Sequence, residues 1–165
     1  SARRVAASLS HQSPDRIPID LGSTAVTGIH VNAVAALRDY YGLRKQPVKV
    51  HEPYQMLGWI DEDLATALSI DTVPVLPREN MFGFPNENWK HWDFRGLPVL
   101  VPEKFHIQTD PDGAFLIFPK GDTPHPPDRD QLARVVADLH LPGLGPLPAV
   151  DRPRPPGERA DPGGA

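Results

Sequence analysis

The chain of 165 residues contains no cysteine. Disulfide bonds, thiolate catalysis and cysteine-based zinc sites are therefore excluded within these residues, and the absence leaves the cellular compartment undecided. No apolar run is long enough to cross a bilayer, and the first residues lack the apolar core of a signal peptide, so we expect a cytoplasmic protein. Phenylalanine, tyrosine and tryptophan are all missing after Phe118.

A strong excess of one charge is also missing. The 17 basic and 21 acidic residues give a net charge of -4 and are mixed along the chain. This balance indicates neither nucleic acid nor an anionic membrane as a partner. The motifs G-x-G-x-x-G, G-x-x-x-x-G-K and G-x-S-x-G do not occur. His51 and Glu52 begin like the zinc motif H-E-x-x-H, but Gln55 replaces the second histidine, so no metal site is predicted.

One stretch, residues 13–30, combines turn, strand and loop signals, and it reads S-P-D-R-I-P-I-D-L-G-S-T-A-V-T-G-I-H. Alternating apolar residues predict a short strand over residues 17–21, and small and hydroxyl residues predict the loop after it. A carboxylate at Asp20 is unfavourable to bury unless it is paired or faces a cavity. Asp20 is therefore a site candidate together with Ser23 and Thr24. Alternatively Asp20 caps the backbone of this loop, and the residue type leaves both interpretations open.

Helical spacing of apolar residues predicts three helices, over residues 3–9, 30–41 and 55–68. Gly42 is a natural C-terminal stop for the second helix. The third helix would carry the acidic residues 61–63 on a solvated face, because consecutive helical residues point apart and do not converge on a metal.

The β-branched run at residues 70–76 predicts a second buried strand, although Pro74 interrupts it. Arg78, Glu79 and Asn80 come just past its end. We expect this strand to lie parallel and close to residues 17–21, with the second and third helices packed on one side of the pair.

Residues 88–119 predict an antiparallel β-meander inserted after the second strand. Its strands are expected at residues 89–94, 98–101, 105–109 and 115–118. The turn sequence D-P-D-G at residues 110–113 is a strong hairpin signature. The aromatic residues of this section are expected to form an apolar face of its own, made of Trp89, Trp92, Phe94, Phe105, Phe115 and Phe118.

Residues 124–165 differ in composition from the rest, since proline, arginine, aspartate and glycine dominate their second half. A helical pattern occurs at residues 130–139 only. Such a segment cannot bury enough apolar surface to offset its chain entropy, so we expect disorder, above all after Pro142. Two interpretations stay open: a linker, or non-native residues produced by a reading-frame change in a GC-rich gene.

Four motifs resemble the N-terminal part of the uroporphyrinogen decarboxylase superfamily, which includes cobalamin-linked methyltransferases. They are R-R-V-A-A-S-L-S-H-Q-S-P-D-R-I-P-I-D-L-G, T-G-I-H, Y-Q-M-L and D-E-D-L. The resemblance covers roughly residues 2–123, which we take as one domain ahead of the tail. It implies an α/β fold, the N-terminal portion of a TIM (β/α)8 barrel. Because such barrels typically need about 250 residues, it also implies an incomplete and inactive fragment.

Barrel enzymes carry their chemistry at the carboxyl ends of the strands. The resemblance therefore implies a substrate-binding mouth at those ends, formed by Asp20, Ser23, Thr24, His30, Arg78, Glu79 and Asn80. Decarboxylases of this superfamily hold substrate carboxylates with arginines in the loop after the first strand. Here residues 21–28 contain no arginine.

The resemblance implies a uroporphyrinogen decarboxylase-like lyase whose substrate is a tetrapyrrole, a corrinoid or a methylated molecule. One alternative is a methyltransferase that uses zinc and a corrinoid partner, neither of which this cysteine-free chain would hold by itself. The other alternative is a non-catalytic protein that self-associates into a homo-oligomer through open sheet edges.

Overall fold

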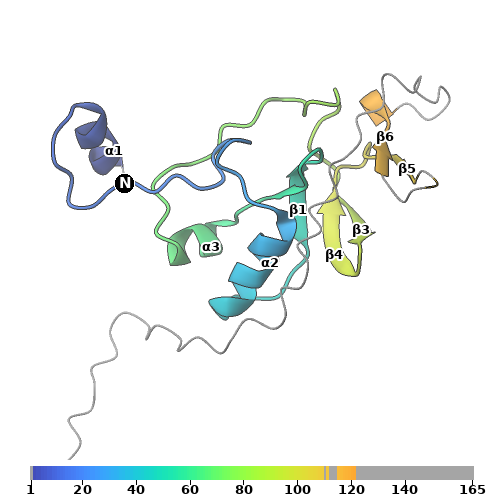
Figure 1. The fold of residues 1–165 in the computed structure, drawn as a ribbon, viewed down its shortest axis with the longest axis horizontal. Coiled ribbons are helices and arrows are strands. Elements are labelled where there is room, and N and C mark those ends of the chain that lie inside the picture. Colours follow the sequence, from blue (N-terminus) through green and yellow to red (C-terminus); the bar gives the residue numbers. More distant parts are fainter. Residues whose placement is uncertain (1, 110, 112–114, 122–165) are drawn as a thin grey trace, which may run out of the picture.

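The computed structural model describes residues 2–109, 111 and 115–121. In chain order its elements are α1 (Ala2–Leu9), α2 (Val31–Tyr40), β1 (Val48–Glu52), β2 (Leu57–Gly58), α3 (Glu62–Ala67), β3 (Lys90–Phe94), β4 (Leu97–Val101), β5 (Ile107–Thr109), β6 (Phe115–Ile117) and the 3-10 helix η1 (Pro119–Gly121). Figure 1 shows α1 at one end of the described fold and the β5–β6 hairpin at the other, with α2, β1, β4 and β3 between them. This is a small α+β fold.

The main sheet has four strands in the order β2-β1-β4-β3. β1 pairs antiparallel with β2 and parallel with β4, where Val48 lies opposite Val99. β4 pairs antiparallel with β3. A separate two-stranded sheet joins β5 to β6, with Ile107 opposite Ile117. Four of the five residues of β1 are buried, as expected for a strand with neighbours on both sides.

Helix α2 lies within the predicted residues 30–41 and ends ahead of the predicted stop at Gly42. The His30 side chain caps its first turn, since Nδ1 accepts a hydrogen bond from the Asn32 N–H at 3.1 Å. Gly42 follows the helix with φ +65°. The N–H groups of Gly42 and Leu43 donate to carbonyls of the last turn at 3.0 and 2.9 Å, as in a Schellman motif. The predicted helix and its glycine stop are confirmed.

The hydrophobic core joins α2 to the main sheet and extends to the β5–β6 hairpin. Its buried members are Val31, Val34, Val48, Val50, Met56, Leu64, Phe82, Phe84, Phe94, Val99, Val101, Phe105 and Ile117. Close approach of β2 to this core requires glycine at position 58. A Cβ on Gly58 would lie 2.8 Å from Val34 Cγ2 and 2.9 Å from Val48 Cγ1.

Both hairpins of the predicted meander are confirmed. Arg95 and Gly96 connect β3 to β4 with φ values of 51° and 89°. Two positive φ values are typical of a type I′ turn, whose twist matches that of the flanking strands. β5 and β6 pair where the D-P-D-G sequence predicts a hairpin. Most residues of that second turn lie outside the described residues.

The aromatic cluster of the meander is confirmed for four of its six residues. The ring centroid of Trp92 lies 5.7 Å from Phe94, 5.2 Å from Phe105 and 5.5 Å from Phe115. Because Phe94 and Phe105 also belong to the main core, this face is not separate from the rest of the molecule.

The prediction that these four strands form one antiparallel meander is wrong. β4 pairs with β1 on its other side, so the first hairpin completes the main sheet, whereas β5 and β6 form their own. Trp89 and Phe118 lie outside the aromatic cluster: Lys49 Nζ is 5.4 Å from the Trp89 ring, and Phe118 packs on His106.

The prediction of an α/β fold, part of a TIM (β/α)8 barrel, is wrong. A barrel needs successive parallel strands, but the described residues contain one parallel pair, β1 and β4. Residues 17–21 and 70–76 form no strand. They do lie side by side, since the Asp71 N–H donates to the Ile19 carbonyl at 2.8 Å. Each segment contains a proline, which cannot donate to a ladder.

The predicted helix over residues 55–68 is wrong in its first half. Leu57 and Gly58 form β2 and pair with β1, and Met56 has φ +53°, outside the helical region. The helix is confined to α3 and follows Asp61. Apolar residues at a spacing of three or four therefore reflect burial here and not a continuous helix.

The acidic residues 61–63 are not simply a solvated face. The guanidinium of Arg38, whose side chain is 4% exposed, makes two hydrogen bonds of 2.8 Å to Asp63 and one of 3.4 Å to Asp61. Asp63 and Asp61 together raise the pKa of Arg38, and the Arg38 hydrogen bond lowers the pKa of Asp63. This pair ties α3 to α2.

Ion pairs, and not buried apolar residues, attach α1 to the rest of the molecule, since α1 has no buried residue. Arg4 forms ion pairs with Asp15 and with the buried carboxylate of Asp71. Arg16 reaches the same Asp71 at 2.8 Å. The predicted N-terminal helix is confirmed, and the P-D-R sequence that follows it acts as part of its attachment.

The predicted tail at residues 124–165, including its helical pattern at residues 130–139, lies outside the described residues. None of the helices in the described part of the chain combines the length and the apolar composition that crossing a bilayer requires.

Candidate functional site

A cavity of about 510 Å³ lies at the carboxyl end of β1. Its walls come from the loop at residues 23–25, the turn after β1 and the extended segment before Asn80. Its size is within the range of small-molecule sites. Ser23, Thr24 and Asn80, three of the predicted site residues, line this one cavity. We call it the Asn80 cavity.

Glu52 shapes the turn that forms one wall. Its carboxylate accepts hydrogen bonds from the N–H groups of Tyr54 at 3.0 Å and Gln55 at 2.7 Å. Pro53, which lies between Glu52 and Tyr54 in the sequence, has no N–H and restricts φ in the turn. Glu52 is 9% exposed, and no ion pair joins it to an arginine or lysine among the described residues.

Two asparagines connect the opposite wall to β1. Asn80 Oδ1 accepts from the Phe82 N–H at 2.9 Å, and Asn80 Nδ2 donates to Asn86 Oδ1 at 3.3 Å. Asn86 Nδ2 in turn donates to the His51 carbonyl at 2.9 Å. Phe82 and Phe84 are buried between these asparagines and stack with centroids 6.3 Å apart. The turn thus has an apolar anchor and an amide link to the end of β1.

Asp20 organises the loop but does not line the cavity. Its carboxylate accepts hydrogen bonds from the hydroxyl groups of Ser23, of Thr72 at 2.8 Å and of Thr27 at 3.4 Å. The Ser23 hydrogen bond contributes most to lowering the pKa of Asp20. Asp20 therefore holds Ser23 at the cavity wall and links this loop to the segment around Thr72.

Three further candidates lie away from the cavity. His30 caps α2 and packs on Phe94 with ring centroids 5.6 Å apart, and burial lowers its pKa. Arg78 and Glu79 are exposed beyond the cavity wall. The structure therefore brings together Ser23, Thr24 and Asn80, and leaves Asp20, His30, Arg78 and Glu79 outside.

His51 lines the Asn80 cavity and was considered in the sequence only as a metal ligand. It is 5% exposed, its ring stands edge-on to Trp59 at 5.9 Å, and no described residue hydrogen-bonds to its ring nitrogens. Burial lowers its pKa, which keeps the imidazole neutral at pH 7. The signal that could have identified it is a polar pair, His51 and Glu52, at the carboxyl end of a valine-rich strand.

The cavity lining contains hydroxyl, amide, imidazole and phenol groups together with one carboxylate, that of Glu52. It contains no arginine or lysine among the described residues. In the described part of the chain, no three histidine, aspartate or glutamate side chains are placed to hold a metal ion. The arrangement is suited to hydrogen bonding of a small neutral or cationic molecule.

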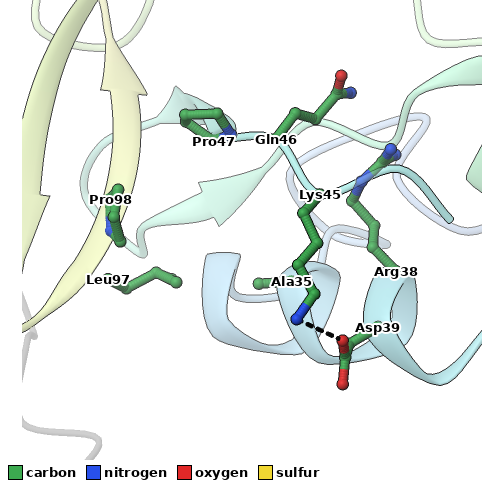
Figure 2. A pocket seen from close by; sticks show the side chains of 8 residues that line it. All are labelled: Ala35, Arg38, Asp39, Lys45, Gln46, Pro47, Leu97 and Pro98. Atoms are coloured by element: carbon green, nitrogen blue, oxygen red, sulfur yellow. Dashed lines mark ion pairs between the residues drawn. The ribbon is translucent and has the colours of Figure 1, made fainter. Parts of the chain in front are cut away.

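A second cavity, of about 480 Å³, lies between α2, the segment after it and β4. Figure 2 shows Lys45 and Asp39 facing each other at its edge, joined by an ion pair of 3.2 Å, while the Arg38 head points away from Asp39. Its other walls include Leu97 and Pro98. It contains no predicted site residue, and its charged groups are paired with protein groups, so the Asn80 cavity is the better candidate.

Comparison with protein-family models finds no match to this chain. Comparisons with curated proteins and with solved structures likewise find no match. The resemblance to the uroporphyrinogen decarboxylase superfamily therefore stays a prediction based on short motifs.

Proposed function

We propose that the chain binds a small methylated substrate in the Asn80 cavity, as a uroporphyrinogen decarboxylase-like protein of the methyl-transfer kind. The proposal combines the sequence resemblance with one structural observation. Ser23 and Thr24 come from one loop and Asn80 from another segment, yet all three share a cavity. Its single lining carboxylate, Glu52, has no cationic neighbour in that lining. The barrel that the resemblance implied has no part in the proposal.

The same observation makes decarboxylation of uroporphyrinogen the weaker alternative. That substrate carries eight carboxylates, and each needs a cation or several hydrogen-bond donors when it leaves water. The described lining offers no arginine or lysine, and Glu52 would repel a carboxylate. A neutral or positively charged methylated compound avoids both difficulties.

Binding to the full 165-residue chain tests the proposal. Trimethylammonium, tetramethylammonium and dimethyl sulfide serve as methylated probes, and coproporphyrin serves as the polycarboxylate, all measured by isothermal titration calorimetry. We expect at least one methylated probe to bind and coproporphyrin not to compete with it. Binding of coproporphyrin in place of the methylated probes would favour the decarboxylase, and binding of no probe would reject the proposal.

Two neighbouring residues offer a matched pair of variants. Ala25 lines the cavity, whereas Val26 is 94% exposed and does not. Ala25→Trp should fill the cavity and abolish binding. Val26→Trp adds the same indole ring outside the cavity, so it should leave the affinity within about twofold. Equal effects of the two variants would place the binding site elsewhere.

The chain is not expected to turn over either substrate class. The methyl-transfer branch activates a thiol on a zinc ion that cysteines hold, and this chain has no cysteine. Zinc ligands and a corrinoid partner would therefore have to come from other protein groups. Assays for uroporphyrinogen decarboxylation and for methyl transfer should both give no product. Turnover in either assay would contradict this expectation.

Self-association is a second candidate function, favoured by three exposed β-branched side chains. Ile17, Val73 and Val75 are 82%, 82% and 91% exposed on two extended segments that lie side by side. A second copy presents the same side chains, and exposed apolar groups of two copies can bury one another. The sheet edge at β3 is less suited, since its exposed Lys90 and other charged side chains disfavour pairing.

Light scattering after size-exclusion chromatography tests this candidate. The chain should elute as a dimer or larger species, and Val73→Lys should shift it to the monomer, since Val73 is 82% exposed and does not line the Asn80 cavity. Val26→Lys is the control, because Val26 is as exposed but lies outside residues 17–21 and 70–76. A monomeric wild-type chain at high micromolar concentration would reject self-association.

A further inference from the structure

We infer that His51 makes the Asn80 cavity selective for protonated methylated amines, whose N–H group it accepts as a hydrogen bond beside the Glu52 carboxylate. This inference rests on the proposed function, because it names the chemical class of the substrate for the same cavity. It adds a requirement that the proposed function does not contain: the ligand needs both a positive charge and a hydrogen-bond donor.

The acceptor is a buried imidazole without a partner. His51 is 5% exposed and lines the cavity, yet no described residue hydrogen-bonds to its ring, and the Asn86 amide binds only its main-chain carbonyl. Buried polar side chains are nearly always hydrogen-bonded. Among the described residues, the one fully enclosed polar side-chain atom without a partner is Arg38 Nε, so the His51 nitrogens are not sealed off by protein. A ligand in the cavity can supply the missing donor.

The edge-on contact with Trp59 holds the imidazole in place, with ring centroids 5.9 Å apart. The Asn86 amide holds the backbone of the same residue. An acceptor that is fixed before the ligand arrives loses little conformational entropy on binding, which improves affinity.

The positive charge of the ligand is matched by Glu52. Its carboxylate accepts two backbone N–H groups, which leaves lone pairs on both oxygens for a third contact. Coulombic attraction in a partly enclosed site is stronger than in water. Glu52 thus favours a cation, and His51 discriminates between cations with and without an N–H donor.

The titratable groups around His51 are few. Glu52 lies on the same strand and Tyr54 on the following turn, while the walls at residues 23–25, 75–81 and Asn86 contribute no titratable side chain to the lining. Protonation of His51 would replace the acceptor by a donor and place a second positive charge beside the ligand. Binding should therefore weaken as the pH falls through the pKa of His51, which burial keeps below 6.5.

The test compares two probes that differ by one donor. Trimethylammonium keeps an N–H group and tetramethylammonium has none, so their affinity ratio for the unmodified chain at pH 7 measures the contribution of the acceptor. We expect trimethylammonium to bind about tenfold tighter or more, as for a hydrogen bond to a charged group. Equal affinities would overturn this inference and leave the proposed function intact. Binding of neither ammonium probe would also overturn the inference, and the proposed function itself would be rejected only if dimethyl sulfide failed to bind as well.

Histidine variants assign the effect to the residue. His51→Phe keeps a ring against Trp59 and removes the acceptor, so the affinity ratio should fall to about one. His106→Phe is the matched control, since His106 also stands edge-on to an aromatic ring, at 4.8 Å from Phe118, but away from the cavity. Imidazole nitrogen shifts measured by NMR should move for His51 on addition of trimethylammonium and stay constant for His106. Unchanged His51 shifts during saturable binding would contradict the inference.

Discussion

Two regions of the described chain are held together by different kinds of hydrogen bond. The sheet unit, made of α2 and β1 to β4, uses backbone ladders and a shared apolar core. The extended unit, made of residues 13–28 and 70–80, has no strand and joins its two segments largely through side chains. There Asp71 accepts hydrogen bonds from Arg16 and from the Ile19 N–H, and Asp20 accepts one from Thr72.

This difference explains where the Asn80 cavity forms. Ladder pairing brings backbones to a fixed close spacing and leaves no room between strands. The extended unit meets the end of β1 through the amide link from Asn80 and Asn86 to the His51 carbonyl and not through a ladder, so space remains beside it. His51 and Glu52 come from the sheet unit, and Ser23, Thr24 and Asn80 come from the extended unit.

The largest expected effect comes from breaking the sheet unit at its tightest contact. Gly58→Val places methyl groups where Val34 and Val48 already lie within 3 Å of a Cβ. We expect a loss of about 2–3 kcal/mol in the free energy of unfolding, measured with urea. Ala36→Val, on the exposed side of α2, is the control and should cost less than about 0.7 kcal/mol. A Gly58→Val chain of unchanged stability would mean that β2 is not packed on α2.

The next effect should be confined to the extended unit. Asp71→Asn removes the charge that binds Arg4 and Arg16, so the two segments should separate locally while the sheet unit persists. Amide exchange should accelerate at Ile19 and remain slow at Val50. Asp15→Asn is the control, because the Asp15 carboxylate is 68% exposed and its loss should change exchange little. Equal acceleration in both units would show that they unfold together.

Lowering the pH should reduce the stability contributed by the two regions in separate pH ranges. Burial lowers the pKa of His30 and of His51 below 6.5, so the unfolded chain takes up more protons as the pH falls through that value, and stability decreases. Burial also opposes the charged form of Asp71, but the Ile19 N–H and the two arginines outweigh it and hold its pKa below 3.8, so that its contribution is lost only at lower pH. Urea unfolding between pH 7.5 and 3 should show both decreases.

A conservative variant assigns the first decrease. His30→Asn keeps an acceptor for the first turn of α2 and does not titrate. Its free energy of unfolding should depend less on pH between 7.5 and 5.5 than that of the unmodified chain. The same pH dependence in both chains would exclude His30 as a contributor.

The smallest effect is expected at the second cavity. Lys45 and Asp39 are 89% and 70% exposed, and their ion pair is screened by solvent. Lys45→Ala should change the free energy of unfolding by less than about 0.5 kcal/mol, because exposed ion pairs contribute little. A larger loss would show that this cavity matters for the sheet unit more than its exposure indicates.

Several elements could be predicted because their signals are short in sequence. Helix α2 lies between a cap at His30 and a stop at Gly42, and the turn at Arg95 and Gly96 defines the β3–β4 hairpin. Alternating apolar residues predict a strand at residues 17–21, and a β-branched run predicts one at residues 70–76. Neither forms, since Pro18 and Pro74 lack the donors that a ladder needs. Amino-acid composition therefore indicated local conformation but did not indicate which segments pair as strands.

Part of the candidate site could be predicted from local sequence signals, and part could not. Ser23, Thr24 and Asn80 follow extended segments, and residues in such positions often face a common space. His51 was missed as a cavity residue, because its burial and its contact with Trp59 depend on where β2 returns along β1. No spacing within the sequence indicates that Asn86 reaches the His51 carbonyl.

The sequence by itself determined the caps, the tight turns and the absence of thiol chemistry, since each depends on residue types a few positions apart. Tertiary structure decided that β1 pairs with β4 in parallel and that the extended unit forms no strand. The physical reason is that a ladder forms between segments brought together by core burial, and burial depends on every element that packs against them. The Asn80 cavity exists where these two kinds of association meet.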